Sequence, residues 1–105
     1  MVVGAYVALM VVHLHFPDAH SLKGKRKDLV SVKEVLRRRY GVSVAEVSGQ
    51  DTWQRAELAL ALTGGSATHV QEGVDRVLRF LDERFPQGVR VDRLLTSYED
   101  LGVVG

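Results

Sequence analysis

The chain has no cysteine, no asparagine and no isoleucine among its 105 residues. Without cysteine there can be no disulfide framework, no thiol nucleophile and no cysteine-ligated zinc. A reducing cytoplasm is therefore the expected location. The missing asparagine, together with ten arginines against four lysines, is a compositional bias compatible with a thermophilic source, and a GC-rich genome would give the same bias.

The chain also lacks a hydrophobic run long enough to cross a membrane. Its first 16 residues, MVVGAYVALMVVHLHF, are mostly apolar, but His13 interrupts them, and neither a positive segment nor a small-residue cleavage site accompanies them. We therefore predict a strand here, with no signal peptide and no membrane span. A hydrophobic content of 46% and a charged content of 26%, without repeats or linkers, predict one globular domain over residues 1–105.

Four segments have the pattern of β-strands. Residues 3–15 are rich in Val, Leu and Tyr, and residues 42–47 (VSVAEV) are short and β-branched. Residues 55–63 alternate strictly, with leucines and Ala56 on one face. A last strand in GVRVDRLLTSYE loses its alternation at Leu94 and Leu95, so we expect a bulge or an early end there.

Two further segments have helical periodicity. After Ser21, a natural N-cap, apolar residues recur at spacings of seven, three and four up to Gly41, a typical helix end. The second helix begins after Ser66 and ends before Pro86. The order strand, helix, strand, strand, helix, strand predicts an α+β fold of the ferredoxin-like βαββαβ type, with two helices on one face of a four-stranded antiparallel sheet.

Three stretches, HFPDAHSLKGKRKDL, YGVSVAEV and QDTWQRA, resemble the YlxP-like family of small bacterial proteins, a domain of unknown function. The resemblance runs nearly end to end and implies a ferredoxin-like fold and a cytoplasmic protein. Members tend to be encoded beside translation-initiation and ribosome-maturation factors, which implies a connection with RNA or the ribosome. Relatives usually carry Glu where this chain has Gly24, and that Glu would complete a capping box with Ser21.

Positive charge is concentrated on the first helix. Residues 20–40 contain eight Lys or Arg and two Asp or Glu, a local balance of +6, whereas the whole chain carries +1. Helical geometry places six of the basic side chains on one broad arc that could follow a phosphate backbone. The alternative is a solvated helix face, balanced by acidic residues of the second helix. We predict a non-enzymatic module that binds RNA or the ribosome through Lys23, Lys25, Arg26, Lys27, Lys33, Arg37 and Arg38.

A second surface is predicted on the side of the sheet that the helices leave uncovered. If alternate residues from Tyr6 to Phe16 face the core, the residues between them face outward and are unusually apolar for a solvated surface. This face lacks the aromatic side chains on which RNA-recognition modules stack bases. The alternative function is therefore a protein–protein adaptor or a homodimer, with the partner-binding residues Val7, Leu9, Val11 and His13 on this face and Trp53 in the turn-rich connection SGQDTWQ.

The spacing of His13 and His15 puts both imidazoles on one strand face. With His20 or Asp18 they could hold a metal ion, so a small metal-dependent enzyme is a third possibility. An isolated H-x-H is a weak signal, however, and Glu46 is a lone carboxylate. No nucleophile motif, P-loop or dinucleotide fingerprint is present. We therefore assign no catalytic residue, no metal ligand, no cofactor and no small-molecule substrate.

Overall fold

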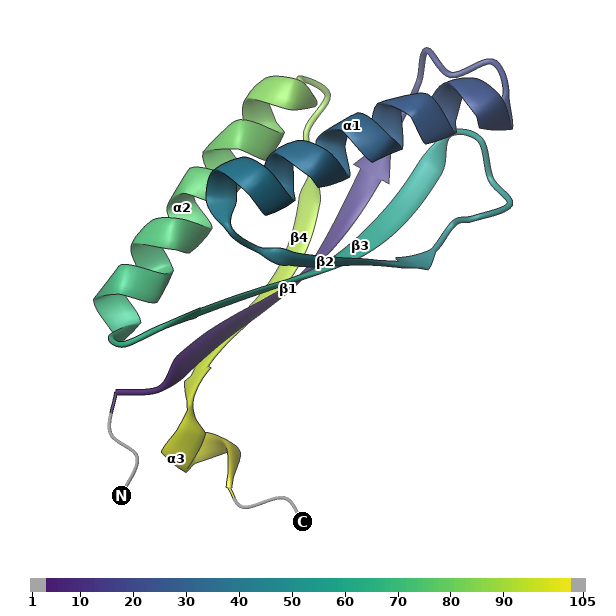
Figure 1. Ribbon diagram of the computed structural model, residues 1–105. Helices are drawn as coiled ribbons and strands as arrows, with labels where there is room; N and C mark the ends of the chain where they lie inside the picture. The colour runs from purple at the N-terminus through teal and green to yellow at the C-terminus, as the bar shows by residue number, and fades with distance from the viewer. Residues whose placement is uncertain (1–3, 103–105) are drawn as a thin grey trace.

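The computed structural model describes residues 4–102. Its main elements follow one another in the predicted order, which confirms the ferredoxin-like α+β fold (Figure 1). The elements are β1 (Tyr6–His15), α1 (Leu22–Tyr40), β2 (Ser43–Ser48), β3 (Arg55–Gly64), α2 (Ala67–Arg84), β4 (Arg90–Ser97) and the short α3 (Tyr98–Leu101).

The sheet is antiparallel throughout, with the strand order β2-β3-β1-β4. β1 lies inside it, and alternate β1 side chains from Ala8 to Leu14 are buried. This alternation follows because successive side chains of a strand point to opposite faces of the sheet. The predicted orientation of β1 is confirmed, since Met10 and Val12 belong to the core and Leu9 is exposed.

Both long helices begin at the serine that the sequence indicates. The Ser21 hydroxyl accepts a hydrogen bond from the Gly24 amide at 3.1 Å, and the Ser66 hydroxyl accepts one from the His69 amide at the same distance. Each bond satisfies one of the amides that a helix start leaves without a partner. At the end of α1, Gly41 takes a left-handed conformation with φ of 66°, which costs a glycine little.

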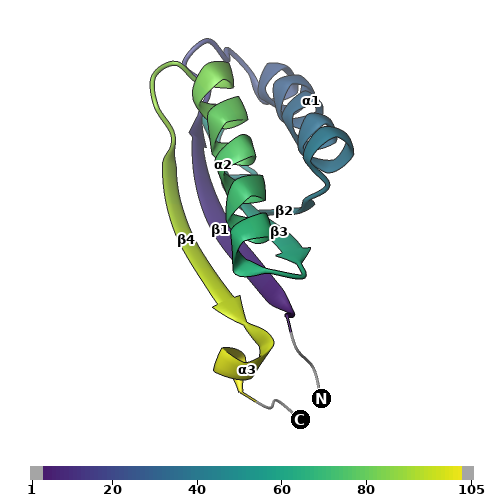
Figure 2. The same cartoon turned by 90° about the vertical axis from the view of Figure 1, so that its left-hand side faces the viewer.

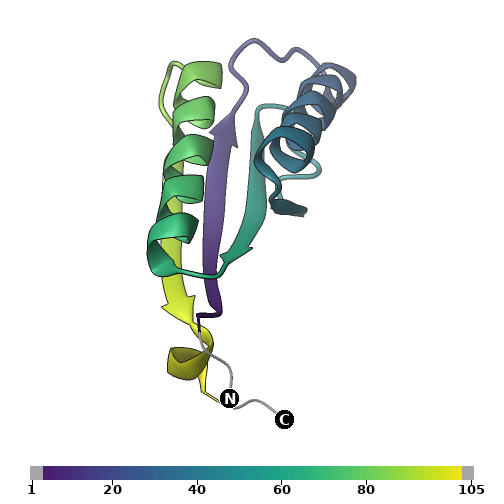
Figure 3. The same cartoon turned by 60° about the vertical axis from the view of Figure 1, so that its left-hand side comes forward.

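The two long helices cover the same face of the sheet (Figure 2). α2 packs on β1, β3 and β4, while α1 packs on β2 and on α2 (Figure 3). The core lies between the helix layer and the sheet. The opposite face, which we call the free sheet face, is formed by the outward side chains of the strands. Within residues 4–102, no helix is long and apolar enough to cross a membrane.

Three details differ from the sequence predictions. The last strand does not bulge at Leu94, because β4 pairs with β1 without interruption from Arg90 to Ser97. Leu94 is exposed on the free sheet face and Leu95 packs against the core, so the two leucines continue the alternation on opposite faces. The irregularity lies instead in β2, between Glu46 and Ser48. The sequence patterns also missed α3, and the predicted strand residue Val3 lies outside the described residues.

Candidate functional site

Five of the six exposed basic side chains of α1 form one surface, which we call the cationic face, and the sixth, Arg39, points to another side of the helix. They lie on one side of the helix because 100° per residue brings positions three, four and seven apart together. All of its members are exposed. From the first to the last, the face extends about 22 Å along the helix axis at a rise of 1.5 Å per residue. Its members are Lys23, Arg26, Lys27, Arg37 and Arg38.

Lys25 does not belong to this face. The prediction that Lys25 contacts nucleic acid is therefore wrong. Its side chain is only 2% exposed, and its ammonium group donates hydrogen bonds to the carbonyl oxygens of Gly49 and Thr52 in the loop after β2. A phosphate has no access to it there. The signal was present in the sequence, since Lys25 precedes the core residue Leu29 by four positions and therefore shares its stripe.

Burial also changes the acid–base behaviour of Lys25. Loss of hydration lowers the pKa of its ammonium group below the ordinary value of 10.5, and the nearby Arg26 charge lowers this pKa further. The carboxylates of Glu46 and Asp51 oppose this shift because they stabilise the charged form. One carboxylate oxygen of Glu46 is buried and has no hydrogen-bond partner among the described residues. Lys25 is thus a structural cation beneath the loop.

Lys33 is also drawn away from the cationic face. It is half-buried, and its ammonium group lies 3.6 Å from the Glu46 carboxylate on β2. Its charge is therefore largely balanced within the chain, and it is a weaker candidate for phosphate contact than the sequence indicates.

The members of the cationic face keep most of their charge available. Arg26 and Arg37 each donate a hydrogen bond of 3.3 Å to a backbone carbonyl, of Gln50 and Val44 respectively, and a carbonyl does not neutralise a cation. Only Arg38 pairs with a carboxylate, that of Glu34 at 3.5 Å. Such an exposed pair contributes little and is easily exchanged for another anion.

Lys23 and Lys27 have no hydrogen-bond or ion-pair partner within residues 4–102. They lie in the first turns of α1, where the helix dipole disfavours positive charge. No acidic residue occupies the first turn to compensate. These two ammonium groups are therefore the most accessible cations of the cationic face.

The loop after β2 brings together sequence motifs that are far apart in the chain. Besides its contacts with Lys25 and Arg26, the loop contributes the carbonyl of Gln54, which accepts a hydrogen bond from the Phe16 amide at 2.8 Å. Trp53 lies in this loop, 49% exposed, as the turn-rich sequence around it indicates. The predicted partner-binding residues therefore do not all share one surface.

The free sheet face carries the other predicted partner-binding residues. Val7, Leu9, Val11 and His13 alternate with the buried residues of β1 and point away from the helices. The antiparallel register places Leu9 beside Ala61 of β3 and Leu94 of β4. The middle of this face is therefore apolar, whereas charged side chains gather at the end nearest His13.

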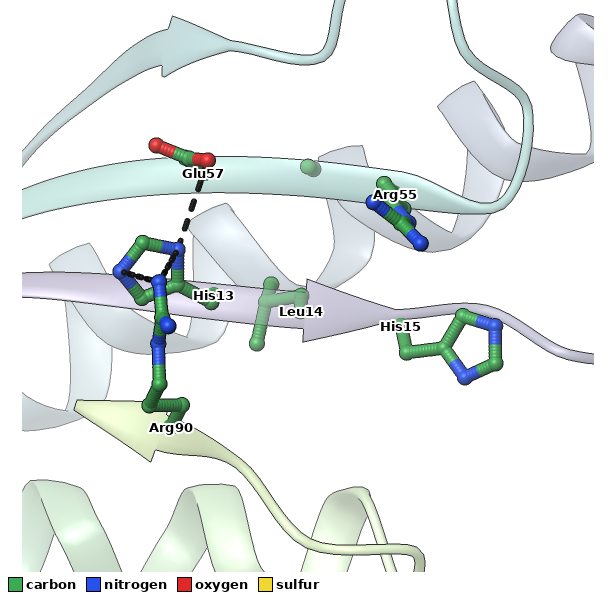
Figure 4. Close-up of a pocket in the computed structure, with 7 residues that line it drawn as sticks. His13, Leu14, His15, Arg55, Glu57 and Arg90 are labelled. Carbon is green, nitrogen blue, oxygen red and sulfur yellow. Dashed lines mark hydrogen bonds and ion pairs between the residues drawn. The ribbon is translucent and has the colours of Figure 1, made fainter.

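Three charged side chains, those of Glu57, Arg90 and Asp92, lie close to His13, and Figure 4 shows the first two. The imidazole lies 3.4 Å from the Glu57 carboxylate and 3.0 Å from the Asp92 carboxylate. One guanidinium nitrogen of Arg90 is 3.1 and 3.2 Å from the two ring nitrogens, so it lies over the ring and not along either lone pair. A shallow cavity of about 380 Å³ adjoins the cluster.

The histidines that could have formed a metal site are not gathered together. In Figure 4, His15 points away from His13. Among residues 4–102, no group of three or more His, Asp or Glu side chains is placed to hold a metal ion. The carboxylates around His13 instead form ion pairs with it when it is protonated.

Comparisons with known proteins agree with this fold. A family model described as "Protein of unknown function (DUF503)" matches residues 7–92. The chain is 35% identical over 82 residues to the uncharacterized protein YlxP of Bacillus subtilis (strain 168), covering 78% of this chain and 85% of that protein. The de novo designed protein Foldit4 is similar with a TM-score of 0.57 and 14% identity, over 89% of this chain and 97% of that chain. This last likeness shows the fold alone.

Proposed function

The chain belongs to the DUF503 family, as its resemblance to YlxP-like proteins indicated, and we propose that it is a non-enzymatic module that binds structured RNA through the cationic face of α1. The proposal places the protein in the cytoplasm, with free or ribosomal RNA as the partner. One observation carries it: four of the five exposed cations of this face have no carboxylate partner among the described residues. Uncompensated positive charge along one helix attracts a polyanion.

The partner is a polyanion in water and not a bilayer, because the apolar side of α1 is already packed in the core of the protein. Leu29, Val32 and Leu36 are in the core. Only Leu22 and Val30 remain as exposed large apolar residues of this helix. A helix that lies in a membrane interface needs a continuous apolar face to insert, and α1 presents none.

The mode of binding is backbone contact and not base stacking. The strands of the described chain place no Phe, Tyr or Trp on the free sheet face, and Tyr6 packs against the core. Recognition through Lys and Arg alone follows the phosphates and depends little on base sequence. We therefore expect affinity for folded RNA of several sequences, with a strong dependence on salt.

Fluorescence anisotropy with a labelled RNA hairpin tests the proposal. If all five members of the cationic face contact phosphates, log K should fall against log salt concentration with a slope of about −4 to −5. The double variant Lys23→Glu/Lys27→Glu should lose at least tenfold in affinity at low salt, since it reverses the two freest charges of the face.

The matched control is Arg76→Glu/Arg79→Glu, which makes the same charge change at exposed positions of α2. It should bind RNA within about twofold of the wild type if the contact is local to α1. Equal losses in both variants would show a mere net-charge effect, and no binding by the wild type at low salt would also refute the proposal. Duplex DNA of matched length serves as the comparison ligand.

A further inference from the structure

The free sheet face has a shape that no element within residues 4–102 fills. Leu9 and Leu94 are neighbours across β1 and β4, are 44% and 52% exposed, and form a ridge. In the middle of the other half, β2 and β3 carry alanines, and a hollow of about 190 Å³ lies over Ala45, Ala59 and Ala61, whereas Val47, 49% exposed, projects near the end of β2. One half of the face therefore protrudes where the other half recedes.

We propose that this face binds a second copy of the same chain, sheet against sheet. The two-fold axis would run between β1 and β3, parallel to the strands, so that β1 of one copy lies over β3 of the other. The register then sets a large β1 side chain over an alanine of β3 at two positions, because Leu9 pairs with Ala61 and Val11 with Ala59, while Val7 meets Thr63, which has a similar size. A two-fold axis uses this complementarity twice.

The other two-fold arrangement in the interface plane fits less well. An axis perpendicular to the strands would stack β1 on β1 and β3 on β3. Leucine and valine would then meet leucine and valine, and the alanines of β3 would face each other across a void. Packed sheets are about 10 Å apart and fill this space with interdigitating side chains. The axis parallel to the strands sets large side chains over small ones and satisfies that requirement. The perpendicular axis sets side chains of equal size over each other and does not.

The charges of the face are compatible with burial against a second copy. Arg55 and Arg90 balance Glu57 and Asp92, so the polar end is neutral when His13 is neutral. The same axis sets His13 over Glu57 of the second copy, a pairing that already occurs within one chain at 3.4 Å. His13, Glu57 and Arg90 lie at one end of the face, and Asp92 lies level with Val11 on the edge strand β4, so these groups form part of a polar rim beside the apolar centre.

The area is also adequate. Strands of 10, 6, 10 and 8 residues, at about 3.4 Å per residue and about 4.8 Å between strands, cover roughly 550 Å² of sheet plane. The accessible surface of interdigitating side chains exceeds this flat footprint. Stable interfaces usually bury about 800 Å² per partner, so a dimer of this kind has to cover nearly the whole face. The dimer does not depend on RNA binding, because α1 lies on the opposite side of the sheet.

Sedimentation equilibrium over a range of protein concentrations tests the proposal. The wild type should be a dimer, and Leu9→Glu should weaken the dimer at least tenfold because it places a charge in the apolar centre. Val30→Glu, the same kind of change at an exposed position of α1, should leave the dimer unchanged. A monomeric wild type, or a dimer that Leu9→Glu does not weaken, would overturn it.

A size exchange distinguishes a second copy from a different protein partner. Ala61→Leu alone sets leucine over leucine and should weaken the dimer about tenfold. Adding Leu9→Ala exchanges the large and the small side chain across the same axis, so the double variant should recover most of the lost dimer affinity. Circular dichroism verifies that each variant is folded. Loss without restoration in folded variants would contradict the proposed axis.

Discussion

The ammonium group of Lys25 donates a hydrogen bond to the carbonyl oxygen of Gly49, which lies 24 residues later in the chain. A second bond, to the Thr52 carbonyl, completes the attachment of the loop after β2 to the first turns of α1. Two of the stretches that mark the family resemblance, SLKGKRK and QDTWQRA, therefore meet in space. Part of this positively charged stretch serves the fold and not a ligand.

Replacement of Lys25 by methionine should destabilise the protein by about 2 kcal/mol or more, because two carbonyls lose the donor that compensates their burial. Lys23→Met, two residues away and exposed, should change stability by no more than about 0.5 kcal/mol. Urea unfolding followed by circular dichroism measures both. Equal stability of the two variants would show that the buried ammonium contributes nothing to folding.

The same two variants should have the opposite order in RNA binding. Lys23→Met removes a cation of the cationic face and should flatten the salt dependence of log K by about one unit of slope. Folded Lys25→Met should keep the wild-type slope, since Lys25 does not reach solvent. Anisotropy titrations at several salt concentrations separate the two roles, and a flattened slope for Lys25→Met would contradict the assignment.

Stability should rise with pH in the alkaline range because of Lys25. Its pKa is lowered in the folded protein, so between that lowered value and 10.5 the unfolded chain binds more protons than the folded one. The free energy of unfolding then increases with pH across this window. Subtracting the profile of Lys25→Met removes the contributions of the other groups. A difference that falls with rising pH would have the wrong sign for a group disfavoured by burial.

Gly24→Glu should stabilise the protein by about 1 kcal/mol, because it removes a glycine from the helix and supplies the missing member of the capping box. A side chain fits there, since its Cβ would meet only the Ser21 hydroxyl, at 3.5 Å. The added negative charge lies beside Lys23 and Lys27 and should also weaken RNA binding. Gly24→Gln gives the capping group without the charge, so it should stabilise the helix and retain RNA affinity.

Gly49→Ala should destabilise the protein by more than Gly88→Ala. Both glycines have positive φ, of 84° and 99°, so both substitutions strain the backbone. A Cβ at Gly49 would also lie 2.8 Å from the Arg55 carbonyl oxygen, whereas one at Gly88 would meet nothing within 4 Å. The difference in unfolding midpoint between the two variants therefore measures the close approach of β2 and β3. Equal midpoints would show that the loop moves aside freely.

Local patterns predicted most of the fold. The bounds of α1 follow from Ser21 and Gly41, because a cap and a left-handed glycine act within one turn of helix. The orientation of β1 follows from its alternation. Leu94 and Leu95 misled the prediction, since a strand with apolar residues on both faces has no visible period.

The site was harder to predict because charge alone does not reveal where a long side chain ends. Lys25 and Lys23 contribute equally to the local charge, but the helix that packs on the sheet buries one and exposes the other. The partner groups of Lys25 belong to a loop whose path depends on the strand pairing of β2 and β3. The helical stripe of Leu29 already indicates that Lys25 faces inward, and the tertiary structure adds which carbonyl groups its ammonium group reaches.

The contact between Arg37 and the Val44 carbonyl has a consequence for colloidal behaviour. β2 is an outermost strand, and its unpaired backbone groups could recruit a foreign strand into an aggregate. The Arg37 guanidinium donates a hydrogen bond to the Val44 carbonyl of this strand and sets a fixed positive charge beside it. A second copy that paired its own β2 with this strand would have to displace the hydrogen bond from Arg37. The positive charges of the two arginines would also repel each other, which disfavours amyloid-like growth along β2.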